Sequence, residues 1–400
     1  MTERIYYRDP YAIEFDATVV GVEPLSNEHA GRRGVVLDRT AFYPTSGGQP
    51  FDVGSLGSSR VVDVIDQDGD GILHVIDGDL APGPVHGTID WTRRFDHMQQ
   101  HTGQHVVSAA FDRLFDVRTM SFHLGSTAST IDLAREVSAA DMARAESEAN
   151  RVVWEDRPVA IRFTTAAEAA HLPLRKEPTR EGVLRIIDID DWDVSACGGT
   201  HVARTGAIGI IAISGSERFR GGTRVEFVCG GRALETFRNL RESVASSTRL
   251  LSVLPSDVPA SIERLQAEGR DLTKHVKALH TRLATHEAAS LAANAETIGP
   301  LKVVLAALEG WDAGGIKGIA TAIAAQPGHL AVLLTAPPPA AIVVARASDV
   351  GVVDCAAILK RLTAQFGGKG GGKPELAQGG GLTGDLPAVL AAVRADLTGA

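Results

Sequence analysis

Two short motifs, far apart in the chain, constrain its fold more than any other feature. The first contains His101 and His105, and the second contains Cys197 and His201. Side chains four residues apart lie on one face of a helix, so two imidazoles can converge on one ion there. The second pair encloses two glycines, which favour a tight loop over a helix. Three histidines and one cysteine form a complete tetrahedral zinc set, so the pattern predicts that a helix and a distant loop meet around one metal ion.

Each pair alone has a competing interpretation, because isolated histidine pairs are usually surface or core residues. His97 extends the first stripe, but three histidines spread over eight residues of helix span roughly 12 Å and do not share one ion. Asp96 followed by Gln99 resembles an N-cap with its capping box. This predicts a helix over residues 96–115, with His97 half-exposed in the first turn and the next two histidines as ligands.

Length and composition indicate a globular protein with several units. The 400 residues exceed what one hydrophobic core usually holds, and there is no apolar run of about 18 residues that would predict a membrane span. The first residues lack the apolar segment of a signal peptide, and three scattered cysteines do not form a disulfide framework. We therefore expect a cytoplasmic protein in which Cys197 stays reduced and free to bind metal. The net charge of −9 argues against nonspecific nucleic-acid binding but leaves a local basic face open.

The first half of the chain predicts two domains. Residues 1–92 predict a small β-barrel, because short β-branched runs alternate with turn signals. Between these strands, residues 45–49 contain paired glycines that let the backbone approach a ligand closely, although a plain turn is the alternative. Residues 93–230 predict an α+β domain that carries both metal pairs, with a strand and turn over residues 119–126 and a helix from Ser138.

Residues 231–299 predict a helical linker. From Ile262 to His286, six of the eight heptad a and d positions are apolar, which is typical of a helical hairpin or a short coiled coil. A helix that faces a protein core would show a similar pattern, so both interpretations remain open at this stage.

Residues 300–400 predict an α/β domain, because apolar strands alternate with helices. A glycine-rich loop is expected at residues 367–381, where backbone N–H groups can form an anion-binding nest and Lys369 and Lys373 add charge. This segment is not a P-loop, since no Gly-Lys-Ser/Thr leads from it into a helix, and a flexible linker is the alternative. The expected fold class of the whole chain is therefore α+β.

Four segments, in this order, resemble the AlaX family of trans-editing alanyl-tRNA deacylases in its long form, and through it the editing half of alanyl-tRNA synthetase. They are residues 40–49 (Thr-Ala-Phe-Tyr-Pro-Thr-Ser-Gly-Gly-Gln), 101–105 (His-Thr-Gly-Gln-His), 197–201 (Cys-Gly-Gly-Thr-His) and 224–227 (Arg-Val-Glu-Phe). The glycine-rich tail also resembles the C-terminal domain of the synthetase. The resemblance implies zinc on His101, His105, Cys197 and His201. The activation domain of the synthetase has no counterpart in this sequence, so amino-acid activation is not expected.

The resemblance also implies a reaction and its partner. The reaction is hydrolysis, in trans, of the ester that joins serine, or glycine as the second candidate, to the 3′ end of tRNA(Ala). The residues expected at the substrate are Thr45, Ser46, Gly47, Gly48, Gln49, Gly125, Ser126 and Thr200. His123 and Gln104 are the predicted catalytic residues, and this chain has His123 where the synthetase has a glutamine. Thr45, Gln49 and Gln104 are the candidates for contacting the serine hydroxyl.

Two other functions remain open. One is a zinc hydrolase of another ester or peptide, although the peptidase form is disfavoured because the metalloprotease motif needs glutamate directly after the first histidine, where this chain has Thr102. The main alternative is a noncatalytic zinc-containing tRNA-binding protein. The C-terminal region, with its heptads, is also a candidate interface for a homodimer.

Overall fold

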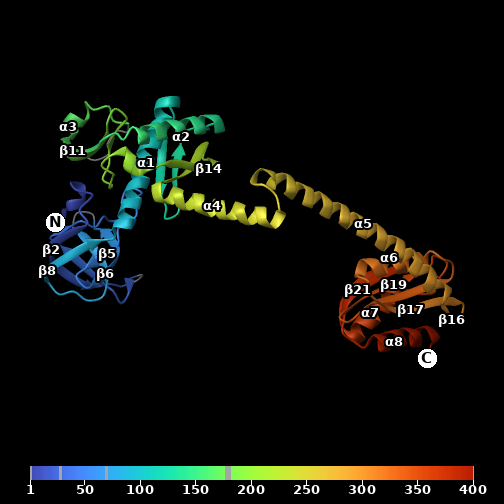
Figure 1. The fold of residues 1–400 in the computed structure, drawn as a ribbon. Helices are drawn as coiled ribbons and strands as arrows, with labels where there is room; N and C mark the ends of the chain where they lie inside the picture. Colours follow the sequence, from blue (N-terminus) through green and yellow to red (C-terminus); the bar gives the residue numbers. More distant parts are fainter. Residues whose placement is uncertain (1, 27–28, 68–70, 176–181, 400) are drawn as a thin grey trace. The chain divides into compact units, whose positions relative to one another are not determined.

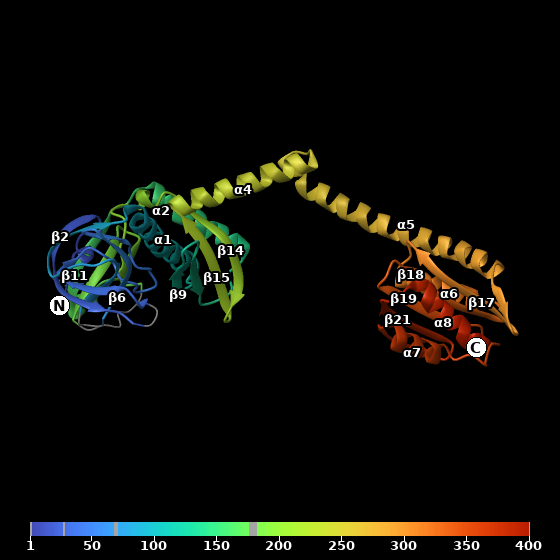
Figure 2. The ribbon, with the colours of Figure 1, turned by 90° about the horizontal axis from the view of Figure 1, so that it is seen from below.

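The computed structural model describes residues 2–26, 29–67, 71–175 and 182–399 (Figures 1 and 2). The chain divides into two compact units, residues 1–246 and 247–400, and each is described by itself. The finer division into four segments stays a prediction. Among the described residues, no helix is both long and apolar enough to cross a membrane.

The first unit begins with a closed six-stranded barrel, as the sequence predicted. The strands, in barrel order, are β2 (Glu14–Pro24), β3 (Arg33–Leu37), β7 (Ile72–Asp77), β6 (Ser59–Asp66), β5 (Gly54–Leu56) and β8 (Gly83–Ile89). Alternate side chains along β2 point into the barrel, where Phe15, Ala17 and Val19 form part of its core. Outside the barrel, β1 (Glu3–Arg4) pairs with β4 (Arg39–Thr40), and a short 3-10 helix covers Ile5–Tyr7.

Helix α1 (Trp91–Phe115) leaves the barrel directly after β8. Its N-cap is Asp90, whose side chain accepts a hydrogen bond from the backbone N–H of Arg93. The prediction of an N-cap at Asp96 was therefore wrong, because an equally good capping residue lies six positions earlier. The helix is longer as a result, and His97 is not a half-exposed residue of the first turn but is buried, with 2% of its surface exposed.

A four-stranded antiparallel sheet packs against α1. Its order is β14 (Ile211–Phe219), β15 (Gly222–Cys229), β10 (Ser129–Leu133) and β9 (Thr119–Leu124). Helix α2 (Ala139–Trp154) begins at its N-cap Ser138, as predicted, and joins the same core. A three-stranded sheet of β11 (Val159–Thr165), β12 (Val183–Ile189) and β13 (Asp193–Ala196) follows, with α3 (Ala166–Ala169) beside it. The loop after β13 carries Cys197 and His201, and η3 (Thr205–Ile208) follows it.

Two long helices follow β15. They are α4 (Gly230–Leu251) and α5 (Val258–Ala293), and η4 (Pro255–Asp257) lies between them. The interpretation of the heptad segment as a core-facing helix was wrong, because its apolar side chains are exposed. These are Ile262, Leu265, Leu272, Val276, Leu279 and Leu283, between 44% and 66% exposed. A coiled coil through this stripe stays a prediction.

The second unit is built on a six-stranded sheet. Its order is β16 (Glu296–Ile298), β17 (Leu301–Glu309), β18 (His329–Ala336), β19 (Ala340–Arg346), β21 (Leu376–Leu382) and β20 (Lys369–Lys373). The end of α5 and α6 (Ala313–Ala324) cover one face, while α7 (Cys355–Phe366) and α8 (Leu386–Thr398) cover the other (Figure 1). Within this six-stranded sheet, among the described residues, β17 and β18 form the only parallel pair, so the predicted α/β domain is in fact a mainly antiparallel α+β sheet.

The predicted glycine-rich loop at residues 367–381 was also wrong. Most of this segment forms the β20–β21 hairpin at the edge of the sheet. A Cβ atom added at Gly370 would lie 2.5 Å from the Cα atom of Gly379. The glycines therefore serve close strand pairing, and this role cannot be distinguished from an open loop by composition alone.

Candidate metal centre

The structure brings the two sequence motifs together within the first unit. His101 and His105 project from α1, and Cys197 and His201 lie in the loop after β13. One potential ligand atom from each of these four residues lies within 4.8 Å of the other three. The Cys197 Sγ atom is 3.4 Å from the Nε2 atoms of both His101 and His201. Tetrahedral zinc, with Zn–N bonds of about 2.0–2.1 Å and a Zn–S bond of about 2.3 Å, separates such atoms by about 3.5 Å. The donor set therefore fits a transition-metal ion.

Gln49 orients the first of these histidines. Its Oε1 atom accepts from His101 Nδ1 at 2.8 Å and from the backbone N–H of Thr200 at 3.1 Å. Its Nε2 atom donates to Thr200 Oγ1 at 2.8 Å, and the whole side chain is buried. A partner at Nδ1 fixes the tautomer that leaves Nε2 free to bind metal. Gln49 thus supports the ligand set from the barrel side, while substrate contact by Gln49 and Thr200 stays a prediction.

Asp193 on β13 holds His105 in the same way. Its Oδ2 atom accepts from His105 Nδ1 at 2.8 Å and from Ser195 Oγ at 2.9 Å, and its Oδ1 atom accepts from Arg175 Nε at 2.6 Å. Burial alone would lower the pKa of His105, but its hydrogen bonds to Asp193 and Cys197 raise that pKa to about 9. Burial opposes ionisation of Asp193, yet the hydrogen bond and charge of His105, together with Arg175, hold the carboxyl pKa below its ordinary value. Asp193 is therefore an ionised acceptor that aims His105 at the cluster.

His201 is positioned from α1. Its Nδ1 atom lies 3.2 Å from Thr102 Oγ1, which also accepts the backbone N–H of Val202 at 3.1 Å. Burial, and then the charge of His101, lower the pKa of His201 to about 3. The imidazole of His201 is therefore neutral at ordinary pH, which is the form that binds metal.

The loop that carries Cys197 is held firmly in place. Burial alone would raise the pKa of the Cys197 thiol, but the charges of His101 and His201 and hydrogen bonds from the histidines hold it well below its ordinary value. The thiolate, which is the metal-binding form, is therefore favoured. Arg185 donates to the carbonyl oxygens of Cys197 at 2.7 Å and of Gly199 at 2.9 Å. A Cβ atom at Gly199 would lie 2.1 Å from His101 Cε1, so only glycine fits there.

The predicted substrate loop, residues 45–48, borders the cluster. Thr45 and Gly47 are exposed, and Ser46 and Gly48 are half-buried. The backbone N–H of Leu124 on β9 donates to the carbonyl oxygen of Gly48 at 3.0 Å, and a Cβ atom at Gly48 would lie 2.8 Å from the Phe122 ring. The Phe122 ring in turn contacts the His101 ring, with 5.6 Å between centroids. Substrate binding by this loop stays a prediction.

Gln104 lies beside the cluster on α1. Its Nε2 atom donates to Ser108 Oγ at 2.8 Å, and Thr119 Oγ1 donates to the same hydroxyl at 2.8 Å. Gln104 is only 2% exposed, and among the described residues its Oε1 atom has no hydrogen-bond partner. Because an unsatisfied buried acceptor costs roughly 1–3 kcal/mol, this oxygen is well suited to accept a hydrogen bond from a bound molecule.

His123 is not brought to the cluster. Successive side chains of a strand point to opposite faces, and Phe122 faces α1 and His101. His123 therefore lies on the outer face of the sheet, where it is exposed. Gly125 and Ser126 follow in the turn that ends β9. A catalytic role for His123 stays a prediction.

The sequence analysis did not identify the residues that orient the ligands. For Asp193 a signal existed, because alternate residues of a strand share a face, and Asp193 and Ser195 lead to Cys197 with this spacing. Thr102 and Arg185 carried no such signal, since a threonine in a helix and an arginine in a strand are ordinary surface residues.

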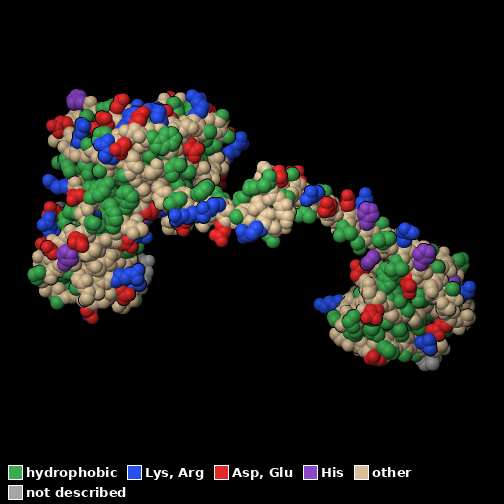
Figure 3. Space-filling model, in the orientation of Figure 1, with side chains coloured by type: hydrophobic (Ala, Val, Ile, Leu, Met, Phe, Trp, Pro, Cys, Tyr) green, Lys and Arg blue, Asp and Glu red, His purple; other side chains and the backbone are tan. Residues whose placement is uncertain are grey.

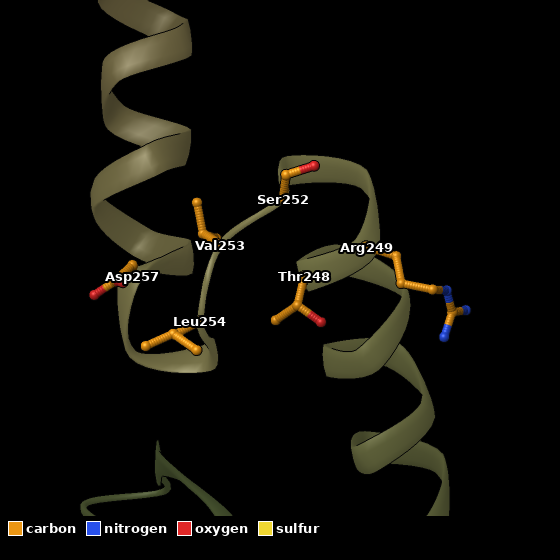
Figure 4. Close-up of a pocket in the computed structure, with 6 residues that line it drawn as sticks. All are labelled: Thr248, Arg249, Ser252, Val253, Leu254 and Asp257. Atoms are coloured by element: carbon orange, nitrogen blue, oxygen red, sulfur yellow. The ribbon is translucent and has the colours of Figure 1, made fainter.

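A separate pocket lies at the turn between α4 and α5 in the second unit (Figure 4). Its lining residues are Thr248, Arg249, Ser252, Val253, Leu254 and Asp257. None of these residues belongs to the predicted site, and the pocket is open to solvent. It is therefore distinct from the metal centre.

Comparison with known proteins identifies the family. A family model described as the threonyl and alanyl tRNA synthetase second additional domain matches residues 184–226, and one described as the DHHA1 domain matches residues 301–399. The alanyl-tRNA editing protein AlaX-L of Pyrococcus horikoshii is 32% identical over 397 residues, which cover 95% of this chain and 94% of that protein. This chain belongs to the AlaX-L family. The family assignment agrees with the resemblance inferred from the motifs.

Alanine–tRNA ligases share the same region with this AlaX-L family member. The ligase of Pyrococcus abyssi is 34% identical over 400 residues, which cover 94% of this chain and 42% of the ligase. The ligase of Pyrococcus furiosus is 36% identical over 329 residues, which cover 77% of this chain and 35% of the ligase. The chain thus spans less than half the length of these ligases.

Proposed function

We propose that this chain is a zinc-dependent deacylase that hydrolyses mischarged Ser-tRNA(Ala), and Gly-tRNA(Ala) as a second substrate, in trans. One observation carries the proposal: a complete four-donor cluster is assembled in a chain matched almost end to end by a relative named as an alanyl-tRNA editing protein. In this proposal His101, His105, Cys197 and His201 hold the zinc. Since four protein donors fill a tetrahedral shell, zinc would supply a Lewis acid to the ester only through a fifth position or in place of a displaced ligand, and would otherwise orient the amino acid or terminal ribose.

The chain's own residues would orient and select the substrate. Gln49, Asp193 and Thr102 keep the three imidazoles in the metal-binding tautomer through the hydrogen bonds described above. The loop at residues 45–48 and the turn at Gly125 and Ser126 would border the substrate from the solvent side. The free Oε1 atom of Gln104 would accept a hydrogen bond from the serine hydroxyl.

Such an arrangement answers a physical need of translation. A pocket for alanine rejects a slightly larger or smaller side chain by only about 1–3 kcal/mol, so errors must be removed at a second site. A site that hydrogen-bonds the serine hydroxyl rejects alanine by roughly 10⁴-fold, because alanine leaves the buried polar groups unpaired. The unpartnered Gln104 acceptor would provide that discrimination between serine and alanine. Glycine also lacks the hydroxyl, so hydrolysis of Gly-tRNA(Ala) would not depend on Gln104.

The test is single-turnover deacylation of Ser-tRNA(Ala), Gly-tRNA(Ala) and Ala-tRNA(Ala) by the zinc-loaded full chain. We expect Ser-tRNA(Ala) to be hydrolysed faster than Ala-tRNA(Ala) by roughly 10³- to 10⁴-fold. Replacing Gln104 with leucine should reduce that ratio, whereas replacing the exposed Gln326 with leucine should not. Equal rates for serine and alanine would refute proofreading, and tight tRNA binding without hydrolysis would select a noncatalytic tRNA-binding protein instead.

The proposal also includes self-association through α5. The apolar side chains at heptad positions of this helix are exposed among charged neighbours (Figure 3). An exposed apolar stripe with this spacing is typical of a coiled-coil helix whose partner helix is not present. We expect the full chain to sediment as a dimer and the Leu272→Glu/Leu279→Glu variant as a monomer. The control is Lys277→Glu on another face of the helix, which should remain dimeric. A monomeric wild-type chain would refute this seam.

A further inference from the structure

His97 is a buried histidine to which the proposed deacylation assigns no role. It lies on α1 one turn before His101, and only 2% of its surface is exposed. Among the described residues its Nδ1 atom has no hydrogen-bond partner. Burial, followed by the charges of Arg93, Arg232 and Arg94, lowers the pKa of His97 to about 3. The ring is therefore neutral at ordinary pH and offers one donor and one acceptor nitrogen.

A second unpartnered polar group lies in the sheet that packs against α1. Ser129 is fully buried, and among the described residues its hydroxyl makes no hydrogen bond. Ser129 pairs with Leu124, the last residue of β9. Arg232 ties this end of the sheet to the helix, because it donates to the carbonyl oxygen of Gly125 at 2.6 Å and pairs with Asp96, the neighbour of His97, at 2.7 Å.

Along α1, His97 lies one turn before the first ligand, His101, whereas Gln104 lies on the other side of His101, between the two ligands. His97 and Gln104 are seven residues apart on α1, which is two helical turns and about 10 Å, so they share a face with His101 between them. The Gln104 end is closed, because Gln104 hydrogen-bonds the fully buried Ser108. The His97 end is near the surface, since Ser126 and Thr127 in the adjoining turn are exposed.

An aminoacyl ester extends in two directions from its carbonyl carbon. One side carries a small amino acid, and the other carries the terminal ribose and the rest of the tRNA. Only the nucleotide side must reach solvent, so an ester beside His101 places the amino acid toward Gln104 and the ribose toward His97. A ribose hydroxyl both donates and accepts, which matches a neutral imidazole and a serine hydroxyl.

We infer that His97 and Ser129 form a subsite for the ribose hydroxyl adjacent to the ester, on the opposite side of His101 from Gln104. This inference rests on the proposed deacylation and assigns the orientation of the substrate in the site. His97 and Ser129 would thus bind the ribose of the substrate, without binding the metal or contacting the amino acid.

The experiment removes the ribose hydroxyl from the substrate and, separately, its proposed partners His97 and Ser129 from the protein. Single-turnover deacylation is measured with Ser-tRNA(Ala) ending in adenosine or in 2′-deoxyadenosine, for wild type, His97→Phe and Ser129→Ala. We expect wild type to lose about 10- to 100-fold in rate beyond the ratio of the uncatalysed esters when the hydroxyl is removed. Each variant should be slower with the ordinary substrate and nearly indifferent to the missing hydroxyl.

Matched controls separate binding from folding. His86→Phe on the barrel surface and Ser121→Ala on the outer sheet face remove an exposed imidazole and an exposed hydroxyl, and both should keep the wild-type ratio. His97→Asn retains a polar group and replaces His97→Phe if zinc content shows that the phenylalanine variant is misfolded. If folded His97 and Ser129 variants lose as much rate as wild type when the ribose hydroxyl is removed, the proposed subsite is wrong but the proposed deacylation is not affected. Absence of deacylation by wild type would instead overturn the proposed function.

Discussion

The Cys197→Ala variant is expected to lose its zinc and, with it, deacylation of Ser-tRNA(Ala). Structural zinc sites bind with about 10–16 kcal/mol, so each of four donors accounts on average for about 2.5–4 kcal/mol. Removing one donor should therefore weaken zinc binding by about 60- to 700-fold. The thiolate also lies 3.4 Å from two of the imidazoles, so its loss removes the negative charge at the centre of the cluster. Competition with a chelator measures the affinity, and single-turnover hydrolysis measures the activity.

Cys229→Ala provides the matched control for that variant. Cys229 is, like Cys197, a free cysteine, but it is fully buried, and its Sγ atom packs against α1 next to Gly103. Burial raises the pKa of its thiol, so it does not supply a thiolate ligand. Its replacement should leave zinc affinity unchanged. Full zinc affinity in Cys197→Ala would contradict the ligand assignment, and full activity in a zinc-free chain would contradict a role for zinc in catalysis.

The ligand cluster was predictable from sequence because its information is local. Spacing alone puts His101 and His105 on one helix face, and Gly198 and Gly199 alone indicate a loop around Cys197. That these two segments meet was inferred from the need of one zinc ion for four ligands, since no sequence pattern links the two segments. The partners of the histidines were not predictable, since Gln49 reaches the cluster from the barrel and only the tertiary fold places it there.

The errors have a common physical origin in signals that fit two structures. Asp96 and Asp90 both suit an N-cap, and the helix starts at the earlier one, where Trp91 and Phe95 in its first turns pack against the hydrophobic core of the first unit. Because the start was placed at Asp96, His97 was predicted to be half-exposed in the first turn, whereas it is buried one turn before His101. In the second unit, the glycines at 370 and 379 suit an open loop and a close strand pair equally well.

The Arg94→Met variant is expected to lose about 3–5 kcal/mol of stability, because it leaves a buried carboxylate unpaired. Arg94 lies on α1 two turns before His101 and is fully buried with Asp52. Its Nε atom donates to both Asp52 oxygens at 3.1 and 3.0 Å, and its Nη1 atom donates to the carbonyl oxygen of Pro10 at 2.7 Å. This arginine therefore fastens the barrel to the helix that carries the ligands. Urea unfolding measures the loss.

The comparison with Arg33→Met decides whether burial causes that loss. Arg33 pairs with Asp79 at 2.9 Å, but both side chains are largely exposed, so its replacement should cost less than about 1 kcal/mol. The double variant Arg94→Met/Asp52→Leu should recover part of the stability, because no buried charge is then left without a partner. Equal losses in the two single variants, or no recovery in the double variant, would show that Arg94 acts through packing rather than through its charge. The ligand-bearing helix would then be anchored to the barrel by shape alone, and zinc affinity should survive the loss of the ion pair.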